Sequence, residues 1–385
     1  RALFGFVSYG RVRFHHRSVL EFLAARRLQM LLARGIPTKA IKRLLIVETA
    51  LDGRAVRPSM AAVAAWLASS HDAIFDELLA LDPAVLLDHA DPQTLSPRQR
   101  IRALEAYVGR YGKGGWRGLR TPRVQVRRFA SEELSPAINR LWSDGIENSE
   151  VRDLLLQTIS VGRVKGSADI AFHVAMDAGL PKHERSVAIE ALLRLQDGRV
   201  EEIATSLAAE PERWPDETAL AVIVDLFPGS LPIPRLEQVL RSVRERTRGI
   251  GALNYHLPEK IGAAPLEFAF LDDLRNLLTR LVVEGVVWRG NSFPKYQTNR
   301  PDLLPSLIAV CRRLARGGAR SAEWAFSASI AVRLAKDGHR TKDDRVELRS
   351  IVAELPPAVR EAVFWREDEL LQSLNVCQAG WERTF

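Results

Sequence analysis

Seven cationic side chains lie close together between residues 110 and 128, and no acidic residue interrupts them. They are Arg110, Lys113, Arg117, Arg120, Arg123, Arg127 and Arg128. Tyr107, Tyr111, Trp116 and Phe129 lie among or beside them. Proteins that bind single-stranded nucleic acid combine cations that track phosphates with rings that stack on bases. We therefore take Trp116, Arg117, Arg120 and Arg123 as candidate recognition residues. The alternative is a connector whose cations pair with acidic neighbours in the same chain.

Motifs for catalysis are missing from the sequence. No GxxxxGK[ST] phosphate loop occurs, and Gly112-Lys113-Gly114-Gly115 has the wrong spacing for one. His183-Glu184 begins like the zinc motif HExxH, but Val187 replaces its second histidine. The carboxylate runs Asp272-Asp273 and Glu367-Asp368-Glu369 are interpreted as solvated helix surface, because neighbouring residues on a helix do not face each other. The sequence predicts that this chain is not an enzyme and has no metal site.

The first thirty residues predict two short strands followed by a helix. Residues 3–7 and 11–14 have the composition of strands, and Gly10 suits the turn between them. Ser18 and Glu21 have the spacing of a capping box. The following apolar residues keep helical spacing, at Leu20, Leu23, Ala24, Leu28 and Leu31. A hairpin that leads into a helix in this way is typical of the wing of a winged-helix domain.

The opening segment resembles the end of the winged-helix segment of NACHT-type STAND NTPases. This family of signal-transduction ATPases includes animal NOD-like receptors and bacterial antiviral sensors. Eight positions match its pattern, namely Phe14, His16, Ser18, Glu21, Phe22, Leu23, Ala24 and Ala25. The resemblance implies that a helical-repeat sensor follows an NTPase module. It also implies that His16 contacts the phosphates of bound ADP, while the alternative role for His16 is structural.

Composition and charge fit this interpretation. The chain of 385 residues is 46% hydrophobic and 26% charged, and it has two cysteines, Cys311 and Cys377, without CxxC spacing. No apolar run approaches the length of a membrane span. We expect a cytoplasmic protein and, because the chain starts at Arg1, a piece of a longer one. Residues 1–128 carry a net charge of +12, whereas the remainder carries −4. The first third is therefore expected to meet something acidic.

Helical patterns dominate the rest of the chain. They are predicted at 38–50, 58–69, 71–81, 97–111 and 181–196, among others, and no strand alternation is found beyond the first hairpin. Irregular loops are predicted at 248–265 and 288–300. The second contains Trp288, Phe293 and Tyr296, which are further candidate recognition residues because binding residues concentrate on loops. Successive helical units begin some 34 to 42 residues apart, near the period of HEAT repeats.

The sequence thus predicts an all-α chain, an α-solenoid of HEAT-like helical pairs preceded by a winged-helix hairpin remnant. The expected segments are the end of the winged-helix segment (1–34), a first helical-repeat block (35–111), a basic connector (112–130) and a HEAT-like repeat domain (131–385).

The leading functional hypothesis is a non-catalytic scaffold or sensor portion of a NACHT-type STAND ATPase. It would recognise a protein target or hold the NTPase core in an autoinhibited state, in antiviral defence. By the resemblance, the parent protein would bind ATP or ADP with magnesium and would form oligomers on activation. Two alternatives stay open. One is a free-standing HEAT-like nucleic-acid-binding module, and the other is a HEAT-like DNA glycosylase, for which Trp142 and Asp144 are the nearest suitable pair.

Overall fold

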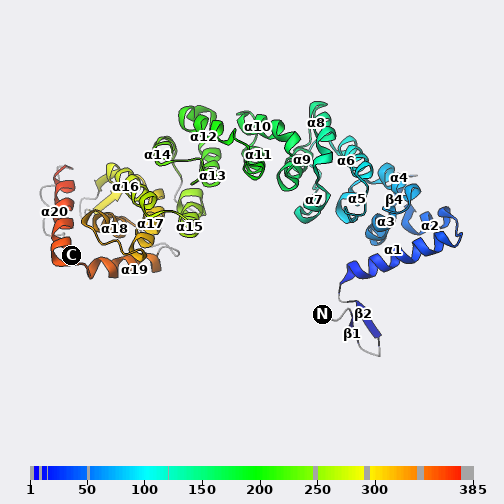
Figure 1. The fold of residues 1–385 in the computed structure, drawn as a ribbon, viewed down its shortest axis with the longest axis horizontal. Coiled ribbons are helices and arrows are strands. Elements are labelled where there is room, and N and C mark those ends of the chain that lie inside the picture. Colours follow the sequence, from blue (N-terminus) through cyan, green and yellow to red (C-terminus); the bar gives the residue numbers. More distant parts are fainter. Residues whose placement is uncertain are drawn as a thin grey trace. The chain divides into compact units, whose positions relative to one another are not determined.

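The computed structural model describes residues 4–7, 11–14, 16–49, 53–119, 121–245, 250–289, 295–335 and 342–373 (Figure 1). In these ranges the protein is all-α, with twenty α-helices and three separate two-stranded sheets. The chain divides into two compact units, Arg1–Val200 and Glu201–Phe385. The four segments expected from the sequence are not tested by this division and stay a prediction.

The first unit contains three short helical turns besides its main elements. In chain order those elements are β1 (Phe4–Val7), β2 (Arg11–Phe14), α1 (Arg17–Ala33), α2 (Thr38–Leu45), β3 (Ile46–Glu48), β4 (Arg54–Val56), α3 (Ala61–Ala68), α4 (Asp72–Leu81), α5 (Ala84–His89), α6 (Pro97–Tyr111), α7 (Arg123–Phe129), α8 (Ser135–Ser143), α9 (Ser149–Gly162), α10 (Ala168–Met176) and α11 (Lys182–Leu195). Strands β1 and β2 pair antiparallel, with Phe4 opposite Phe14. Helix α1 packs on α3, and each later helix packs mainly on near neighbours in the chain.

The second unit begins within α12 and includes one more hairpin. Its elements are α12 (Val200–Ala209), α13 (Asp216–Leu226), α14 (Ile233–Ser242), a π-helical turn (Ala252–His256), α15 (Leu257–Ala263), α16 (Phe268–Glu284), β5 (Val286–Arg289), β6 (Lys295–Thr298), α17 (Leu304–Arg316), α18 (Ala322–Leu334), α19 (Lys342–Ala353) and α20 (Pro357–Ser373). None of the helices in the described ranges is both long enough and apolar enough to cross a bilayer.

Many polar contacts in the first unit join residues roughly thirty apart in the sequence, although Arg123 and Glu190 are 67 residues apart. Such contacts occur from α6 to the start of α12, as in Arg100–Glu133 (3.3 Å), Gly114 N–Glu147 (3.0 Å), Ser135–Ser167 (3.1 Å), Arg152–Glu184 (2.7 Å) and Arg199–Asp169 (2.6 Å). These pairs are 33, 33, 32, 32 and 30 residues apart. These contacts join helices that are near neighbours in the chain.

The helix expected at 181–196 is found as α11, and its apolar stripe is buried at Ala188, Ala191 and Leu192. Its end differs from the expectation. Gln196 takes a left-handed conformation (φ 57°) and its N–H bonds to the carbonyls of Leu192 and Leu193, so the helix stops before Gly198. A glycine is the usual residue at this position, but it is not required.

Two hairpins lie where the sequence predicts none. Ile46–Glu48 lies inside the helix expected at 38–50 and pairs with Arg54–Val56. Strand β5, which begins at Val286, pairs with β6 across the loop expected at 288–300. Each strand is only three or four residues long, so too few residues alternate to give a pattern. The loop expected at 248–265 is wrong as well. There, Glu245 accepts hydrogen bonds from the backbone N–H groups of Ala252, Leu253 and Asn254 (2.5, 3.0 and 2.9 Å), and α15 follows directly.

Buried charge is a feature of the second unit. Arg300 and Asp302 form a bidentate pair (3.1 and 3.0 Å), and their side chains are 3% and 2% exposed. Arg300 also donates to the carbonyl of Leu240 at the end of α14 (2.5 Å). Cys311 in α17 is also buried, and this burial raises the pKa of its thiol to about 12. Such a thiol is an inert core residue.

Candidate recognition sites

The basic connector is more ordered than its sequence suggests. The helical pattern was expected to stop from 112 to 130, but α7 forms within it, anchored by the buried side chains of Val126 and Phe129. Pro122 precedes this helix as its N-cap residue. A seven-residue helix gives only two inward positions, which is too short a pattern to recognise in a sequence rich in arginine.

Carboxylates face several of the connector's cations. Lys113 lies 3.6 Å from Glu147, Arg128 lies 2.6 Å from Asp91, and Arg123 pairs with Glu190. The pKa of Glu147 is lowered, first by the hydrogen bond from the backbone N–H of Gly114 and then by Lys113.

Arg117 uses its backbone N–H to bind Glu150 (2.7 Å), and its guanidinium donates to the carbonyl of Lys113. Arg120 lies outside the described residues. The connector thus places part of its charge against acidic groups of the same unit.

Trp116 is the one exposed ring among the four aromatic residues of this region, with 73% of its surface accessible. Tyr107 and Phe129 are buried, and Tyr111 donates from its hydroxyl to Asp82 (2.8 Å). Burial raises the pKa of Tyr111 to about 12, and the hydrogen bond to Asp82 adds to this shift. A stacking platform for several bases would need more than one accessible ring.

His16 lies at the start of α1, where it is exposed and makes no side-chain capping hydrogen bond. The capping box expected from Ser18 and Glu21 does not form, because α1 begins at Arg17 and Ser18 is already inside the helix. Glu21 instead binds Arg17, one helical turn earlier (2.7 Å). A true capping box is present at Ser96 and Gln99, at the start of α6.

The remaining candidates are only partly described. Trp288 in β5 pairs with Tyr296 in β6, but the positions of their rings, and all of Phe293, lie outside the described residues. Asp144 is exposed at the end of α8. The Trp142–Asp144 pair therefore does not supply the inward carboxylate that a glycosylase would need.

Two acidic sites differ from their expected roles. Glu184 is buried and binds Arg152 through both oxygens (2.8 and 2.7 Å). Glu367 is buried too, and it accepts hydrogen bonds from Ser329 (2.7 Å) and Arg333 (3.1 Å). The interpretation of 367–369 as solvated surface is therefore wrong for Glu367 and also for Asp368, which is buried, whereas Glu369 is exposed. Ser329, the partner of Glu367, is 38 residues away, and no sequence signal indicates this contact.

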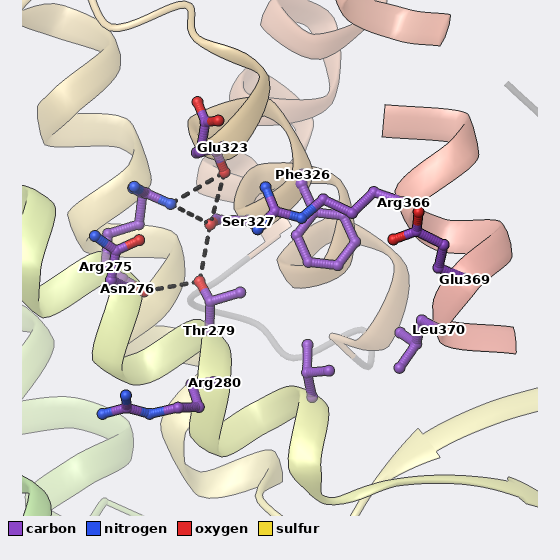
Figure 2. Close-up of a pocket in the computed structure, with 11 residues that line it drawn as sticks. Arg275, Asn276, Thr279, Arg280, Glu323, Phe326, Ser327, Arg366, Glu369 and Leu370 are labelled. Carbon is purple, nitrogen blue, oxygen red and sulfur yellow. Dashed lines mark hydrogen bonds between the residues drawn. The ribbon is translucent and has the colours of Figure 1, made fainter. Parts of the chain in front are cut away.

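A pocket of about 390 Å³ lies among α16, α18 and α20 of the second unit (Figure 2). A buried network forms one wall. Arg275 donates to Ser327 Oγ (2.8 Å) and to the carbonyl of Glu323 (3.0 Å), and Thr279 donates to Ser327 Oγ (2.8 Å). Asp272, just outside the pocket, neutralises Arg275 (2.9 Å). The dashed lines in Figure 2 follow this network, which holds α16 against α18.

The rest of the pocket is apolar inside and charged at the rim. Val283, Phe326 and Leu370 supply apolar surface, and the guanidinium of Arg366 lies 5.0 Å from the centre of the Phe326 ring. The rim carries Arg280 and Arg366 together with Glu323 and Glu369, and Arg280 is paired with Glu237 outside the pocket. Such a recess could receive an apolar side chain of a partner, but its balanced charges select neither an anion nor a cation.

Among the described residues, no group of three or more His, Cys, Asp or Glu side chains is arranged to hold a metal ion. Comparison with protein-family models, curated proteins and solved structures found no match for this chain. The family resemblance therefore rests on the residues of the opening motif alone.

Proposed function

We propose that this chain is a non-catalytic helical scaffold, an α-solenoid of HEAT-like pairs that serves as the sensor portion of a NACHT-type STAND ATPase. The observation that supports the scaffold is the recurrence of an offset of about thirty residues between many polar partners in the first unit. Stacked repeats contact only their neighbours and so produce such an offset. The spacing is shorter than that of HEAT repeats, so the likeness concerns arrangement rather than length.

Stacked pairs expose long surfaces suited to protein recognition. In this proposal the chain recognises a protein target, or packs on the NTPase core and restrains it, and the parent forms oligomers on activation in the cytoplasm. The antiviral role comes from the resemblance alone.

Nucleotide would be held mainly by the rest of the parent protein. ATP or ADP with magnesium supplies the switch between resting and active states in such proteins. Within this chain the one proposed contact is His16. Its imidazole is exposed and makes no side-chain capping hydrogen bond, so it is accessible. An imidazole beside a diphosphate would donate a charge-assisted hydrogen bond.

The coding sequence upstream of Arg1 gives the first test. A GxxxxGK[ST] loop followed by an acidic strand end is expected there. In the parent protein, His16→Ala should weaken ADP retention by about tenfold to a hundredfold, because a hydrogen bond to a charged group contributes about 1.5–3 kcal/mol. His183→Ala is the control, since His183 is exposed and binds Asp153 (3.1 Å). Unchanged retention in both variants would leave His16 a structural residue, and absence of the loop would remove the NTPase from the proposal.

A nucleic-acid-binding module is the second candidate, favoured by the exposed ring of Trp116 beside Arg117. The guanidinium groups of Arg110, Arg117 and Arg127 have no carboxylate partner among the described residues. About three phosphate contacts to single-stranded nucleic acid would give a log–log salt slope of about −2. Anisotropy titrations of labelled single-stranded DNA and RNA at several salt concentrations would measure it. No binding at low salt would eliminate this candidate.

A further inference from the structure

Helix α1 has apolar side chains on both faces, but only one face is covered. Ala25 and Leu28 are buried toward α3, and the Phe22 ring packs edge-on against Trp66 (5.3 Å between centroids). On the other side, Leu20, Leu23 and Met30 are 52%, 45% and 48% exposed. Apolar residues at helical spacing normally face another part of the protein.

The exposure is concentrated in this part of the molecule. Of the twelve large apolar side chains that are exposed in the described ranges, six lie between residues 20 and 44, namely Leu20, Phe22, Leu23, Met30, Ile36 and Leu44. Scattered single exposed apolar residues are normal, whereas a cluster marks an interaction surface.

Cations lie among these apolar residues. At about 100° of rotation per residue, Arg27 projects between Leu20 and Leu23 when α1 is viewed along its axis, and Arg34, the C-cap residue of α1, follows Arg27 on the same side. Both arginines are exposed, and neither side chain has a carboxylate partner in the described part of the chain. We call Leu20, Leu23, Arg27, Met30 and Arg34 the outer face of α1.

The surroundings carry the same charge. From residue 16 to residue 47 there are seven Lys and Arg residues and one acidic residue, Glu21. Glu21 is already engaged by Arg17, and Lys42 is engaged by Glu77 (2.6 Å). A partner that covers the outer face must therefore bring its own carboxylates.

We propose that the outer face of α1 binds an acidic amphipathic helix of a partner protein. Leucine-like residues of that helix would cover Leu20, Leu23 and Met30, and its carboxylates would reach Arg27 and Arg34. This inference rests on α1 alone and does not depend on the proposed function.

Charge complementarity favours an acidic helix over two other occupants, a lipid bilayer and a second copy of this chain. A bilayer would place Arg27 and Arg34 at the centre of the inserted stripe, whereas interfacial helices carry their cations on the polar face. A second copy of this chain would bring the same arginines against themselves, and like charges across an interface are repulsive. An acidic helix avoids both penalties.

The affinity should be modest. With seventeen residues, α1 is about 26 Å long at 1.5 Å per residue. One face of it is smaller than the roughly 800 Å² per partner of a standard interface. We expect dissociation constants of tens of micromolar or weaker and a strong dependence on salt.

Fluorescence anisotropy with a designed peptide tests the proposal. The probe is a fluorescein-labelled eighteen-residue helix with Leu at i, i+3 and i+4 spacing and Glu elsewhere, titrated with the whole chain. Arg27→Glu with Arg34→Glu should weaken binding at least tenfold, and so should Leu23→Ser with Met30→Ser. Because all four side chains are exposed, circular dichroism should show both variants folded.

Arg98→Glu with Lys182→Glu is the matched control, since it makes the same charge change at two exposed cations of the same unit. It should leave binding nearly unchanged. Equal weakening in the control would mean that only net charge matters, and this would overturn the proposal. So would a flat titration, or equal binding of a peptide with Lys in place of Glu.

Two further measurements address the other occupants. In sedimentation with vesicles of phosphatidylcholine and phosphatidylserine, the wild type and the Leu23→Ser, Met30→Ser variant should behave alike. Light scattering should show no self-association that this variant abolishes. Either result in the opposite sense would assign the outer face to a membrane or to a second copy and would overturn the proposal.

Discussion

The two units of the molecule differ in the polar contacts that stabilise each of them internally. In the first unit, many partners lie about thirty residues apart and mostly at the surface, as for Arg100 and Glu133. The second unit has pairs with a similar offset, as for Arg312 and Glu347, which are 35 residues apart. It also has buried guanidinium groups that reach 52 to 60 residues along the chain, as for Arg275 to Ser327 and Arg300 to Leu240. Surface ion pairs contribute little to stability, whereas breaking a buried pair is costly. The second unit should therefore be the more sensitive to loss of a single charge.

The largest effect is expected for Arg300→Ala in the second unit. This change leaves the buried Asp302 carboxylate without its partner and should lower the free energy of unfolding by about 3–5 kcal/mol. Hydrogen exchange in α14 and α17 would then accelerate by about a hundredfold or more, while the first unit keeps its protection.

Arg280→Ala is the matched control, because Arg280 is about half exposed and pairs with Glu237 at 2.5 Å. Its loss should cost less than about 1 kcal/mol. Arg300→Met with Asp302→Leu should recover much of the stability, because apolar replacement of a buried pair is often neutral or stabilising. Equal effects of Arg300→Ala and Arg280→Ala would contradict the contrast between buried and surface pairs.

The first unit contains one buried ion pair that could contradict this contrast between the two units. Glu184 is 3% exposed and accepts two hydrogen bonds from Arg152, which raise the pKa of the arginine. Arg152→Ala should cost about 2 kcal/mol, since hydrogen bonds to charged groups contribute about 1.5–3 kcal/mol. Urea unfolding of this variant beside Arg140→Ala, which loses only a surface pair with Glu105, would measure the difference. A loss as large as that of Arg300→Ala would make the two units alike.

Acid should weaken the first unit through Glu77. Lys42 donates to this carboxylate and Arg54 lies 2.7 Å from it, and Lys42 first and then Arg54 hold the pKa of Glu77 below its ordinary value of 4.5. Because the folded pKa is the lower one, the stabilisation is complete above pH 4.5 and is lost as the pH falls through the folded value.

Glu77→Gln should therefore lower stability at pH 7 by about 1 kcal/mol, and the difference from wild type should shrink below pH 4.5. Thermal unfolding of both proteins across pH 3–7 would show this convergence. A difference that stays constant with pH would mean that the charge of Glu77 does not contribute.

The smallest effect is expected in the connector. Arg123→Ala and Arg128→Ala each remove a surface pair, with Glu190 and Asp91, and should each cost about 0.5 kcal/mol at low salt. Screening should reduce the cost further at 1 M salt. Melting temperatures at both salt concentrations would measure it. A larger loss of stability at either position would mean that the connector's ion pairs contribute as much as the buried pairs of the second unit.

The sequence predicted the features that repeat or that depend on neighbouring residues. The all-α class, the opening hairpin and the helix at 181–196 follow from local spacing, and these are confirmed. The capping box at Ser18 was wrong although its spacing was correct. A capping box depends on where the helix starts, and the N-cap of α1 is His16, two residues before Ser18.

Features that depend on distant partners could not be predicted. The pocket joins residues from Arg275 to Leu370, and the burial of Glu367 follows from Ser329 in another helix. Neither leaves a pattern in a single sequence, because a charged residue looks the same whether it faces water or a partner. The outer face of α1 was missed for the opposite reason. Leu20 and Leu23 fit a buried stripe, and only the structure shows that α3 covers the other side.

The recurring offset in the first unit also bears on how the protein is made. A ribosome adds about 5–20 residues per second, so a partner some thirty residues downstream is synthesised within about two to six seconds. Each helical pair can therefore dock on its predecessor soon after it leaves the ribosome. Exposed apolar surface would then be limited at any moment to the most recent pair. The growing chain would carry little unprotected surface on which nascent proteins aggregate, until synthesis reaches the long-range contacts of the second unit.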